Sequence, residues 1–278
     1  AAWNRLMPSV PKFKPVSAEY LDRFLPENTE AVMGIDFHQL IRSPRTVTVG
    51  RPLLEQFREE KTWTGLIEEL GHDPLSTVDH LVLAVPGRGL TYEQMEKPPF
   101  ILLVRGRFDE KRLWEAARRW EERELLDGSR LKTLHNGAEG QDIVELSIEG
   151  APALYLTLVE DTIVISPDRE LLDNAIGQTS KLNPEFREFL IGKPEEKRLQ
   201  RTVWFAARKE VFGEVEWKWV NDQMLTSYAA GIRQLRGSLV IDHDAHVEIQ
   251  GDFDSDASAL MAQRKVEAGL GRFVRQLQ

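Results

Sequence analysis

Carboxylate and imidazole side chains, the groups best suited to binding a metal ion, gather in one stretch near the C-terminus. In chain order the stretch holds Asp242, Asp244, His246, Asp252, Asp254 and Asp256. Such groups are common protein ligands of Zn²⁺, Mn²⁺ and Ca²⁺. The last three alternate as at the start of a calcium-binding loop. However, Ala257 stands where that loop needs glycine, and Gln263 where it needs a bidentate glutamate.

A structural interpretation suits this stretch better than a metal site. Residues 242–245 have the composition of a hairpin turn, and residues 246, 248 and 250 alternate so that their side chains face water. The later aspartates stand where the cap of a helix is expected. We therefore expect no metal-binding residue and no cofactor. The sequence leaves open whether Asp242, Asp244 and His246 bind a metal.

A pair of tryptophans is a second candidate for binding. Trp217 and Trp219 are separated by one residue, so in an extended chain both side chains lie on the same face. An exposed pair of this kind could stack on a sugar or hold a partner protein. Because large aromatic side chains are usually buried, packing beneath an adjacent helix is favoured, and exposure of the pair stays open.

The chain contains none of the familiar catalytic signatures. It lacks the phosphate-binding loop, the dinucleotide fingerprint, the Gly-x-Ser-x-Gly elbow and the His-Glu-x-x-His motif. Asp36 and His38 share the parity of one expected strand, but a single Asp/His pair is common by chance. The other scattered histidines have no neighbouring nucleophile that a general base would activate. We expect no catalytic residue.

Composition excludes several classes of protein. The 278 residues carry a net charge of −9, whereas binding to nucleic acid calls for a basic face. There is no cysteine, which excludes disulfides, thiolate metal sites and cysteine nucleophiles. Uninterrupted apolar runs span only a few residues, so no segment of the sequence is expected to cross a bilayer.

The first residues indicate a compartment. Ala1-Ala2-Trp3 is followed by a proline-rich run that ends at Pro15. Residues 1–16 therefore look like a tether that leaves a signal peptide or a membrane anchor. A chain trimmed at an arbitrary point is the alternative. We expect an extracytoplasmic location, periplasmic or secreted, with a membrane anchor upstream as one form of it.

Secondary-structure signals favour an α+β fold. Strands are expected over residues 31–37, 78–85, 100–108, 131–135, 142–148, 153–159, 163–165, 202–206, 238–242 and 246–253. Helices are expected over 17–24, 53–57, 66–70, 224–232 and 260–277, and directly after Asp109, Asp168 and Asn183. The strands follow one another in adjacent pairs. This order favours antiparallel sheets with helices packed on one face.

One motif occurs twice and indicates an internal duplication. Val104-Arg105-Gly106-Arg107-Phe108-Asp109 and Ile249-Gln250-Gly251-Asp252-Phe253-Asp254 both end a strand and precede a helix. The order strand, helix, strand, strand, helix therefore occurs twice, with a strand-rich piece between the copies. In each copy we expect glycine to allow a close approach of the backbone, phenylalanine to fill the space between the sheet and the helix, and aspartate to cap the helix. The predicted parts are a tether (1–16), a first module (17–180) and a second module packed on it (181–278).

A resemblance rests on three sets of residues. They are Leu25-Pro26-x-x-Thr29-x-Ala31-Val32, the two Gly-x-Phe-Asp junctions, and Asn183-Pro184-Glu185-Phe186. Over most of residues 20–265 the chain resembles certain bacterial extracytoplasmic proteins of unknown function, some of them abundant in planctomycetes. The resemblance implies an exported location and a duplicated α+β fold. It carries over no catalytic residue.

These observations favour a non-catalytic extracytoplasmic binding or scaffold module. Its partner would be a protein, a glycan or another component of the cell envelope. One alternative is a hydrolase, metal-assisted or not, whose acidic residues and histidines meet only in the folded chain. Another is a carrier that holds an apolar ligand between a curved sheet and its helices.

Overall fold

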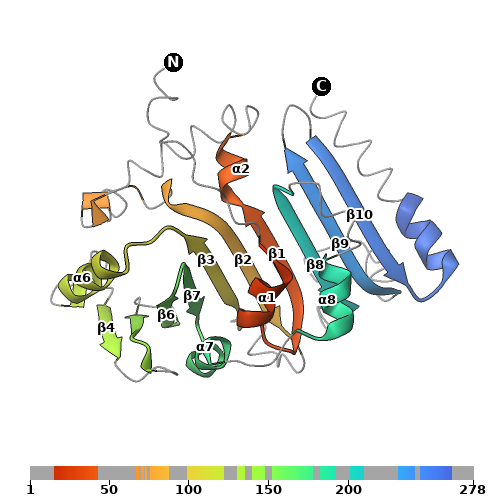
Figure 1. Cartoon of the computed structure of the whole chain (residues 1–278). Coiled ribbons are helices and arrows are strands. Elements are labelled where there is room, and N and C mark those ends of the chain that lie inside the picture. Colours follow the sequence, from red (N-terminus) through yellow and green to blue (C-terminus); the bar gives the residue numbers. More distant parts are fainter. Residues whose placement is uncertain are drawn as a thin grey trace, which may run out of the picture.

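The chain folds as an α+β protein built on one ten-stranded sheet (Figure 1). The computed structural model describes residues 16–42, 67–68, 70–71, 73, 76–87, 99–121, 130–134, 140–147, 152–177, 182–191, 201–209, 231–241 and 245–264. Every neighbouring pair of strands in the sheet is antiparallel. The predicted α+β class with an antiparallel sheet is therefore confirmed.

The strands come from three parts of the chain. The first part gives β1 (Thr29–Asp36), β2 (Val78–Pro86) and β3 (Ile101–Gly106). The second gives β4 (Arg130–Leu134), β5 (Ile143–Ser147), β6 (Leu154–Val159) and β7 (Thr162–Ser166). The third gives β8 (Val203–Arg208), β9 (Ile232–Ile241) and β10 (Ala245–Phe253). Across the sheet the order is β10-β9-β8-β1-β2-β3-β7-β6-β5-β4.

This order contains two groups of three strands, β1-β2-β3 and β8-β9-β10, which meet where β1 pairs with β8. β1 pairs with β8, β2 and β3 follow on one side, and β9 and β10 follow on the other. The four middle strands extend the sheet only beyond β3, where β7 pairs with it. Strands of both predicted modules thus belong to the same sheet. The duplication and the boundary at residue 181 stay predictions.

Helices begin where the sequence supplies a cap. Ser17 Oγ accepts a hydrogen bond from Tyr20 N (3.2 Å) at the start of α1 (Ala18–Phe24). Asp168 Oδ1 accepts one from Leu171 N (3.1 Å) at the start of α7 (Arg169–Ile176). Asn183 Oδ1 accepts from the first turn of α8 (Pro184–Ile191), where Pro184 has no N–H to satisfy. α6 (Glu110–Glu121) starts directly after Asp109, whose carboxylate accepts from Arg112 N, as predicted.

The core lies between one face of the sheet and three helices. α1, α7 and α8 cover this face, which is the front in Figure 1. Val82, Leu103 and Val164 are direct neighbours on β2, β3 and β7 and are almost completely buried beneath the helices. Burying a side chain of this size stabilises the fold by roughly 1.5–3 kcal/mol. Phe24, Leu172 and Phe186 fill the layer from the helix side.

Two aromatic side chains of β8 lie over glycines of the neighbouring strands. A Cβ on Gly34 would come within 2.1 Å of the Trp204 ring, and a Cβ on Gly237 within 2.5 Å of the Phe205 ring. Trp204 lies opposite Gly34, and Phe205 opposite Gly237, in the sheet register. Adjacent residues of a strand face opposite sides of the sheet. The Trp204 ring therefore covers Gly34 on one face, and the Phe205 ring covers Gly237 on the other.

Several predicted elements are wrong at their boundaries, and two of these differences change how the sequence is interpreted. The first strand ends at Asp36, because the Asp36 carboxylate caps α2 (Phe37–Arg42) through a 2.7 Å hydrogen bond from Gln39 N. Asp36 and His38 therefore do not share a strand face. The expected helix over 224–232 overlaps β9, which begins at Ile232 and lies between its two strand partners, β8 and β10. Residues 224–230 lie outside the described part of the chain.

Candidate binding surface

The stretch of aspartates and histidines near the C-terminus, for which metal binding was left open, is only partly within the described residues. Asp242 and Asp244 lie outside them, as do Trp217 and Trp219. His246 lies on β10 with an exposed side chain. In the part of the chain that the structure describes, no three His, Asp or Glu side chains are grouped so that they could hold a metal ion.

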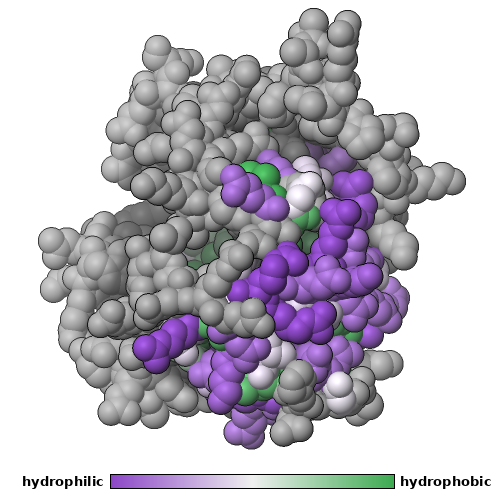
Figure 2. Space-filling model, turned by 90° about the vertical axis from the view of Figure 1, so that its left-hand side faces the viewer, coloured by the Kyte–Doolittle hydropathy of each residue, from purple (hydrophilic) through white to green (hydrophobic). Residues whose placement is uncertain are grey.

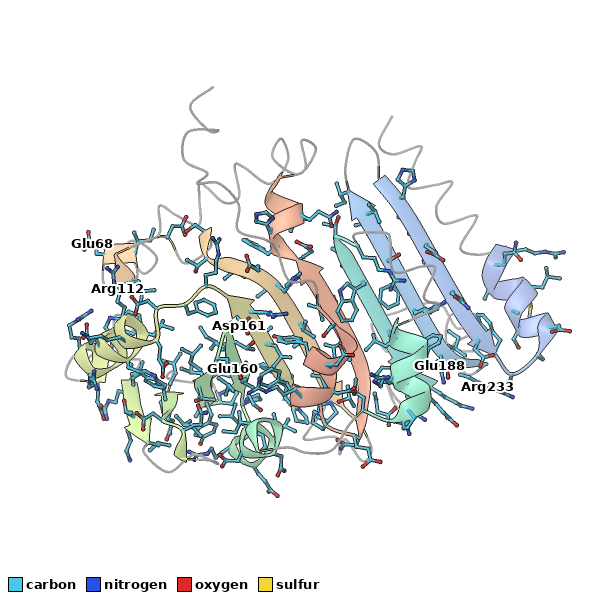
Figure 3. All side chains as sticks on the ribbon, in the orientation of Figure 1. Glu68, Arg112, Glu160, Asp161, Glu188 and Arg233 are labelled. Carbon is cyan, nitrogen blue, oxygen red and sulfur yellow. The ribbon has the colours of Figure 1, made fainter. Side chains whose placement is uncertain are left out.

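Asp254 joins strands instead of capping a helix, so this expectation is wrong. Its carboxylate accepts a hydrogen bond from Arg233 Nε (2.8 Å) and lies 3.8 Å from Lys209 Nζ. The hydrogen bond from Arg233, at the base of β9 in Figure 3, lowers the pKa of Asp254. The helix over residues 256–264 is capped by Ser255, whose Oγ accepts from Ser258 N (3.3 Å). Asp254 is thus held by the two strand ends, and the adjacent serine takes the cap.

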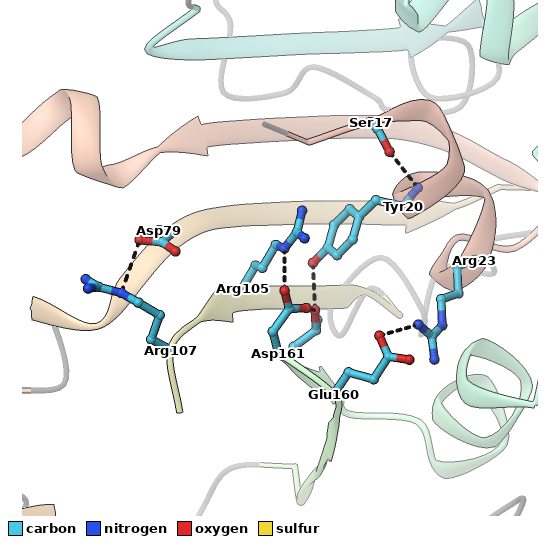
Figure 4. Close-up of polar contacts among 9 residues, drawn as sticks. Ser17, Tyr20, Arg23, Asp79, Arg105, Arg107, Glu160 and Asp161 are labelled. Carbon is cyan, nitrogen blue, oxygen red and sulfur yellow. Dashed lines mark hydrogen bonds and ion pairs between the residues drawn. The ribbon is translucent and has the colours of Figure 1, made fainter. Parts of the chain in front are cut away.

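A polar network fixes α1 to the sheet (Figure 4). The Tyr20 hydroxyl lies 3.2 Å from Thr162 Oγ1, which lies 3.1 Å from Asp161 Oδ1. The Arg105 guanidinium covers the Tyr20 ring at 4.6 Å, and its Nε donates to Asp161 Oδ2 (3.1 Å). Burial raises the pKa of Tyr20 to about 12. The phenol therefore stays protonated at neutral pH, and the network serves to hold α1 in place.

Strand pairing places Asp36 opposite a different histidine from His38, the one that is close to it in the sequence. Asp36 on β1 lies opposite His80 on β2, which is buried. Burial, together with the smaller effect of the neighbouring charge of Asp79, raises the pKa of Asp36 to about 6, although the hydrogen bond from Gln39 N acts to lower it. No local spacing signals this pair, because the two residues are brought together only by strand pairing.

The largest exposed apolar side chains of the described residues lie mainly at the β10 end of the sheet. Residues 246–250 of β10 are exposed on both faces, and β10 pairs with β9 alone among the described strands. Exposed fractions reach 53% for Val247 and 44% for Ile249. In the helix over 256–264 they reach 49% for Leu260 and 46% for Met261. We call the outer edge of β10, with Val247 and Ile249, the β10 edge.

The apolar character of this edge continues across the sheet. Ile249 lies opposite Gly237, Gly237 opposite Phe205, and Phe205 opposite Met33, so these residues face the same side. Because Gly237 has no side chain, the Phe205 ring fills its place. Met33 at the inner end of this row is 41% exposed. The row lies on the side away from α1, α7 and α8, since Val32, next to Met33, belongs to the core beneath those helices.

The other face of β10 is polar. His246, Glu248, Gln250 and Asp252 alternate with the apolar residues and are exposed. Gln250 is bound to Arg236 on β9 (Nε to Oε1, 2.9 Å). Arg236 in turn donates to the Phe189 carbonyl of α8 (3.0 Å), and its guanidinium lies 5.4 Å from the centre of the Phe189 ring. β10 thus presents two acidic side chains on one face and two aliphatic side chains on the other.

The opposite end of the sheet is different. Figure 2 looks onto the side formed by α6 and β4, where most of the surface of the described residues is hydrophilic. β4 has five residues, and its Thr133 N–H donates to Glu121 Oε1 of α6 (3.3 Å). A helix side chain thus already occupies a donor of this edge. Short or occupied edges of this kind resist pairing with another chain.

Comparisons with known proteins give a fold resemblance alone. No protein-family model and no curated protein matches the sequence. One solved structure, crystal form IV of TP0453 from Treponema pallidum, is similar with a TM-score of 0.44 and 9% identity. The similarity covers 82% of this chain and 79% of that one. Crystal form I gives a TM-score of 0.40 and 8% identity over 83% and 77%. The resemblance to planctomycete families stays a prediction.

A helix needs about 20 predominantly apolar residues to cross a bilayer. Among the described residues, no helix combines the length and the apolar character that a membrane crossing requires.

Proposed function

We propose that this chain is a non-catalytic binding or scaffold module that acts outside the cytoplasm. The observation that supports the proposal most directly is the β10 edge, where Val247 and Ile249 are about half exposed on a strand with no second partner among the described strands. Exposed apolar side chains gathered at one place on a surface commonly mark an interaction site. The partner would be a protein, a glycan or another envelope component.

The contacts of the polar residues support the non-catalytic part of the proposal. Asp168 and Asn183 cap helices, Asp254 joins two strands, and Tyr20 holds α1. Each of these roles is fulfilled by local backbone geometry or by an ion pair. A group that serves in this way needs no substrate to explain its position.

A second candidate, a hydrolase, is favoured by one observation. The carboxyl group of Asp36 has a pKa raised to about 6 and lies opposite a buried imidazole, that of His80. An acid of this strength can exchange a proton near neutral pH. The same carboxylate caps α2, which explains its position without a reaction.

The duplicated fold is proposed as the origin of this surface. The two strand groups have mirrored orders about the β1–β8 pair. In both junctions a phenylalanine ring covers the glycine two residues before it: Phe108 covers Gly106, and Phe253 covers Gly251. The strands inserted after α6 complete the sheet beyond β3. No described strand does the same beyond β10, and an exposed edge is the result.

Site-specific photo-crosslinking tests the proposed function. A photoreactive amino acid is placed at Ile249 in the full chain, expressed in its own organism, and at Glu170 on α7 as a matched exposed control. We expect a discrete cross-linked product with an envelope component at position 249 and none at 170. The proposal fails if position 249 yields no product, or the same products as position 170. Fractionation of the same cells must place the chain outside the cytoplasm.

A further inference from the structure

β3 and β10 occupy corresponding places in their strand groups, but among the described strands β3 has a neighbour on its outer side and β10 has none. Each is the third strand of its group and leads into a Gly-x-Phe-Asp junction. β3 pairs with β7 through Leu102 opposite Ile165 and Val104 opposite Ile163. Among the described strands, none pairs with the outer side of β10. The backbone groups of that side therefore form a template for an additional strand.

Matching the two junction glycines shows which side chains such a strand would meet. Leu102 and Val104 of β3 correspond to Val247 and Ile249 of β10, so the face that meets aliphatic residues of β7 is preserved. On the other face the buried Leu103 corresponds to Glu248. Beyond the glycine, Arg107 corresponds to Asp252. The strand that fits β10 would carry aliphatic residues on one face and cationic residues on the other.

We propose that β10 accepts an extended segment of another protein, in which aliphatic and basic residues alternate, as the next strand of the sheet. This proposal rests on the proposed function as a binding module. Main-chain hydrogen bonds along β10 would give affinity, and alternate side chains would give specificity. Aliphatic residues would cover Val247 and Ile249. Lysine or arginine would face Glu248 and Asp252, since opposite charges across neighbouring strands stabilise their pairing.

A second copy of this chain fits the edge less well. Pairing β10 with its own copy would place Glu248 and Asp252 near acidic residues of the same kind, and like charges across strands destabilise a pair. β4 of a second copy would supply alternating basic and aliphatic residues in Arg130, Leu131 and Lys132. However, its Thr133 N–H already donates a hydrogen bond to Glu121. Each chain also carries a net charge of −9, which opposes association of copies.

Peptide binding tests the proposal on the full chain. The probe is a fluorescein-labelled peptide of alternating valine and lysine, equal in length to the nine residues of β10, and binding is followed by fluorescence anisotropy. A control peptide has the same sequence with methylated amide nitrogens at the residues whose N–H would pair with β10. We expect saturable binding of the first peptide and loss of binding for the second, because methylation removes the main-chain donors.

Protein variants separate pairing at β10 from general attraction to an acidic chain. Glu248→Lys should weaken binding by about tenfold, since it replaces attraction with repulsion at the edge. Glu170→Lys makes the same change of charge on α7 and should alter the affinity by less than about twofold. Ile249→Lys tests the aliphatic face and should weaken binding as Glu248→Lys does. Circular dichroism checks that the variants are folded.

Several outcomes would overturn the inference. These are no binding of the valine–lysine peptide, equal binding of the methylated peptide, or equal effects of Glu248→Lys and Glu170→Lys. A chain that forms oligomers by itself, and keeps or strengthens them on Glu248→Lys but loses them on Ile249→Lys, would identify a second copy as the occupant instead. If the partner cross-linked at position 249 still binds Glu248→Lys and Ile249→Lys, the β10 inference fails while the binding module stands.

Discussion

The two groups of three strands have the same order and the same closing motif, but they differ in how they are covered. One face of β1, β2 and β3 is buried beneath the covering helices, and β7 continues the sheet beyond them. β8, β9 and β10 end in a strand whose residues 246–250 are exposed on both faces. At corresponding positions Leu103 is buried and Glu248 is exposed. The same place in the strand order can therefore be buried in one group and exposed in the other. The elements that cover the strand decide whether an apolar or a charged side chain can stand there.

The largest expected effect comes from shortening side chains at this pair of positions. Leu103→Ala removes a fully buried side chain and should lower the free energy of unfolding by about 3 kcal/mol through lost burial and a remaining cavity. Glu248→Ala at the corresponding exposed position should change it by less than about 0.5 kcal/mol. Urea denaturation of both variants measures the difference. Equal effects would mean that β3 and β10 are covered to the same degree.

A smaller difference is expected at the two junction glycines. A Cβ on Gly106 would lie 2.5 Å from the Thr77 carbonyl oxygen, a backbone atom that also accepts a hydrogen bond from Arg107 N. Gly106→Ala should therefore cost about 2–3 kcal/mol, since the backbone cannot easily move aside.

The matched variant is Gly251→Ala, whose Cβ would meet the Phe253 ring at 2.5 Å. That ring lies at the sheet edge and can rotate away, so the cost should stay below about 1 kcal/mol. Thermal unfolding of both variants checks the order of the two effects. A larger effect at Gly251 would show that the second junction is the more tightly packed one.

Asp36 and Asp254, one in each strand group, should make the free energy of unfolding depend on pH in opposite directions. Burial raises the pKa of Asp36 from 3.8 to about 6, so the native state binds this proton more tightly than the unfolded chain does. Its contribution to stability is greatest below 3.8 and falls as the pH rises through about 6. Asp36→Asn keeps a cap for α2 and should raise stability at pH 7 by about 1 kcal/mol, a value reduced for partial exposure to solvent.

Asp254 is the control, because the hydrogen bond from Arg233 lowers its pKa. Its contribution is present above the ordinary value of 3.8 and is lost as the pH falls through the lowered one. Urea midpoints measured across pH for Asp36→Asn and Asp254→Asn give the two slopes. If Asp36→Asn left the slope between pH 4 and 6 unchanged, the raised pKa would be wrong.

The smallest expected effect concerns the hairpin that supplies the strand beside β3. Glu160, between β6 and β7, has a φ of 55°, in the left-handed region that asparagine adopts more readily than glutamate. Glu160→Asn should raise stability by about 0.5 kcal/mol. The lost ion pair with Arg23 should matter little, since both side chains are largely exposed. A melting temperature below that of the native chain would contradict this expectation.

Local features of the fold were predictable from the sequence, whereas the pairing of distant strands was not. Ser17, Asp109 and Asn183 cap helices as predicted, because a cap depends on neighbouring residues. Gly71, with a φ of 72°, directly follows the helix expected over residues 66–70, and its N–H donates to the Ile67 carbonyl, as at a helix end. In contrast, β1 pairs with β8 across a long stretch of sequence, and no local pattern selects that partner.

The candidate surface was predictable only in part. His246, Glu248 and Gln250 were expected to face water, and they are exposed. Strands with this alternation usually have one covered face, which in β10 would be the face of Val247 and Ile249. They are exposed because no described element covers β10, and the presence of a cover is a property of the whole fold. The pairing of Asp36 with His80 was missed for the same reason.

The position of Arg236 has a mechanical consequence. A single guanidinium holds Gln250 of β10, the Phe189 carbonyl of α8 and the ring of the same phenylalanine. α8 inserts Phe186 into the core, so the outermost described strand, besides its pairing with β9, has a side-chain link to the centre of the protein. A pulling force on β10 is therefore transmitted inward and does not simply peel the strand from the rim.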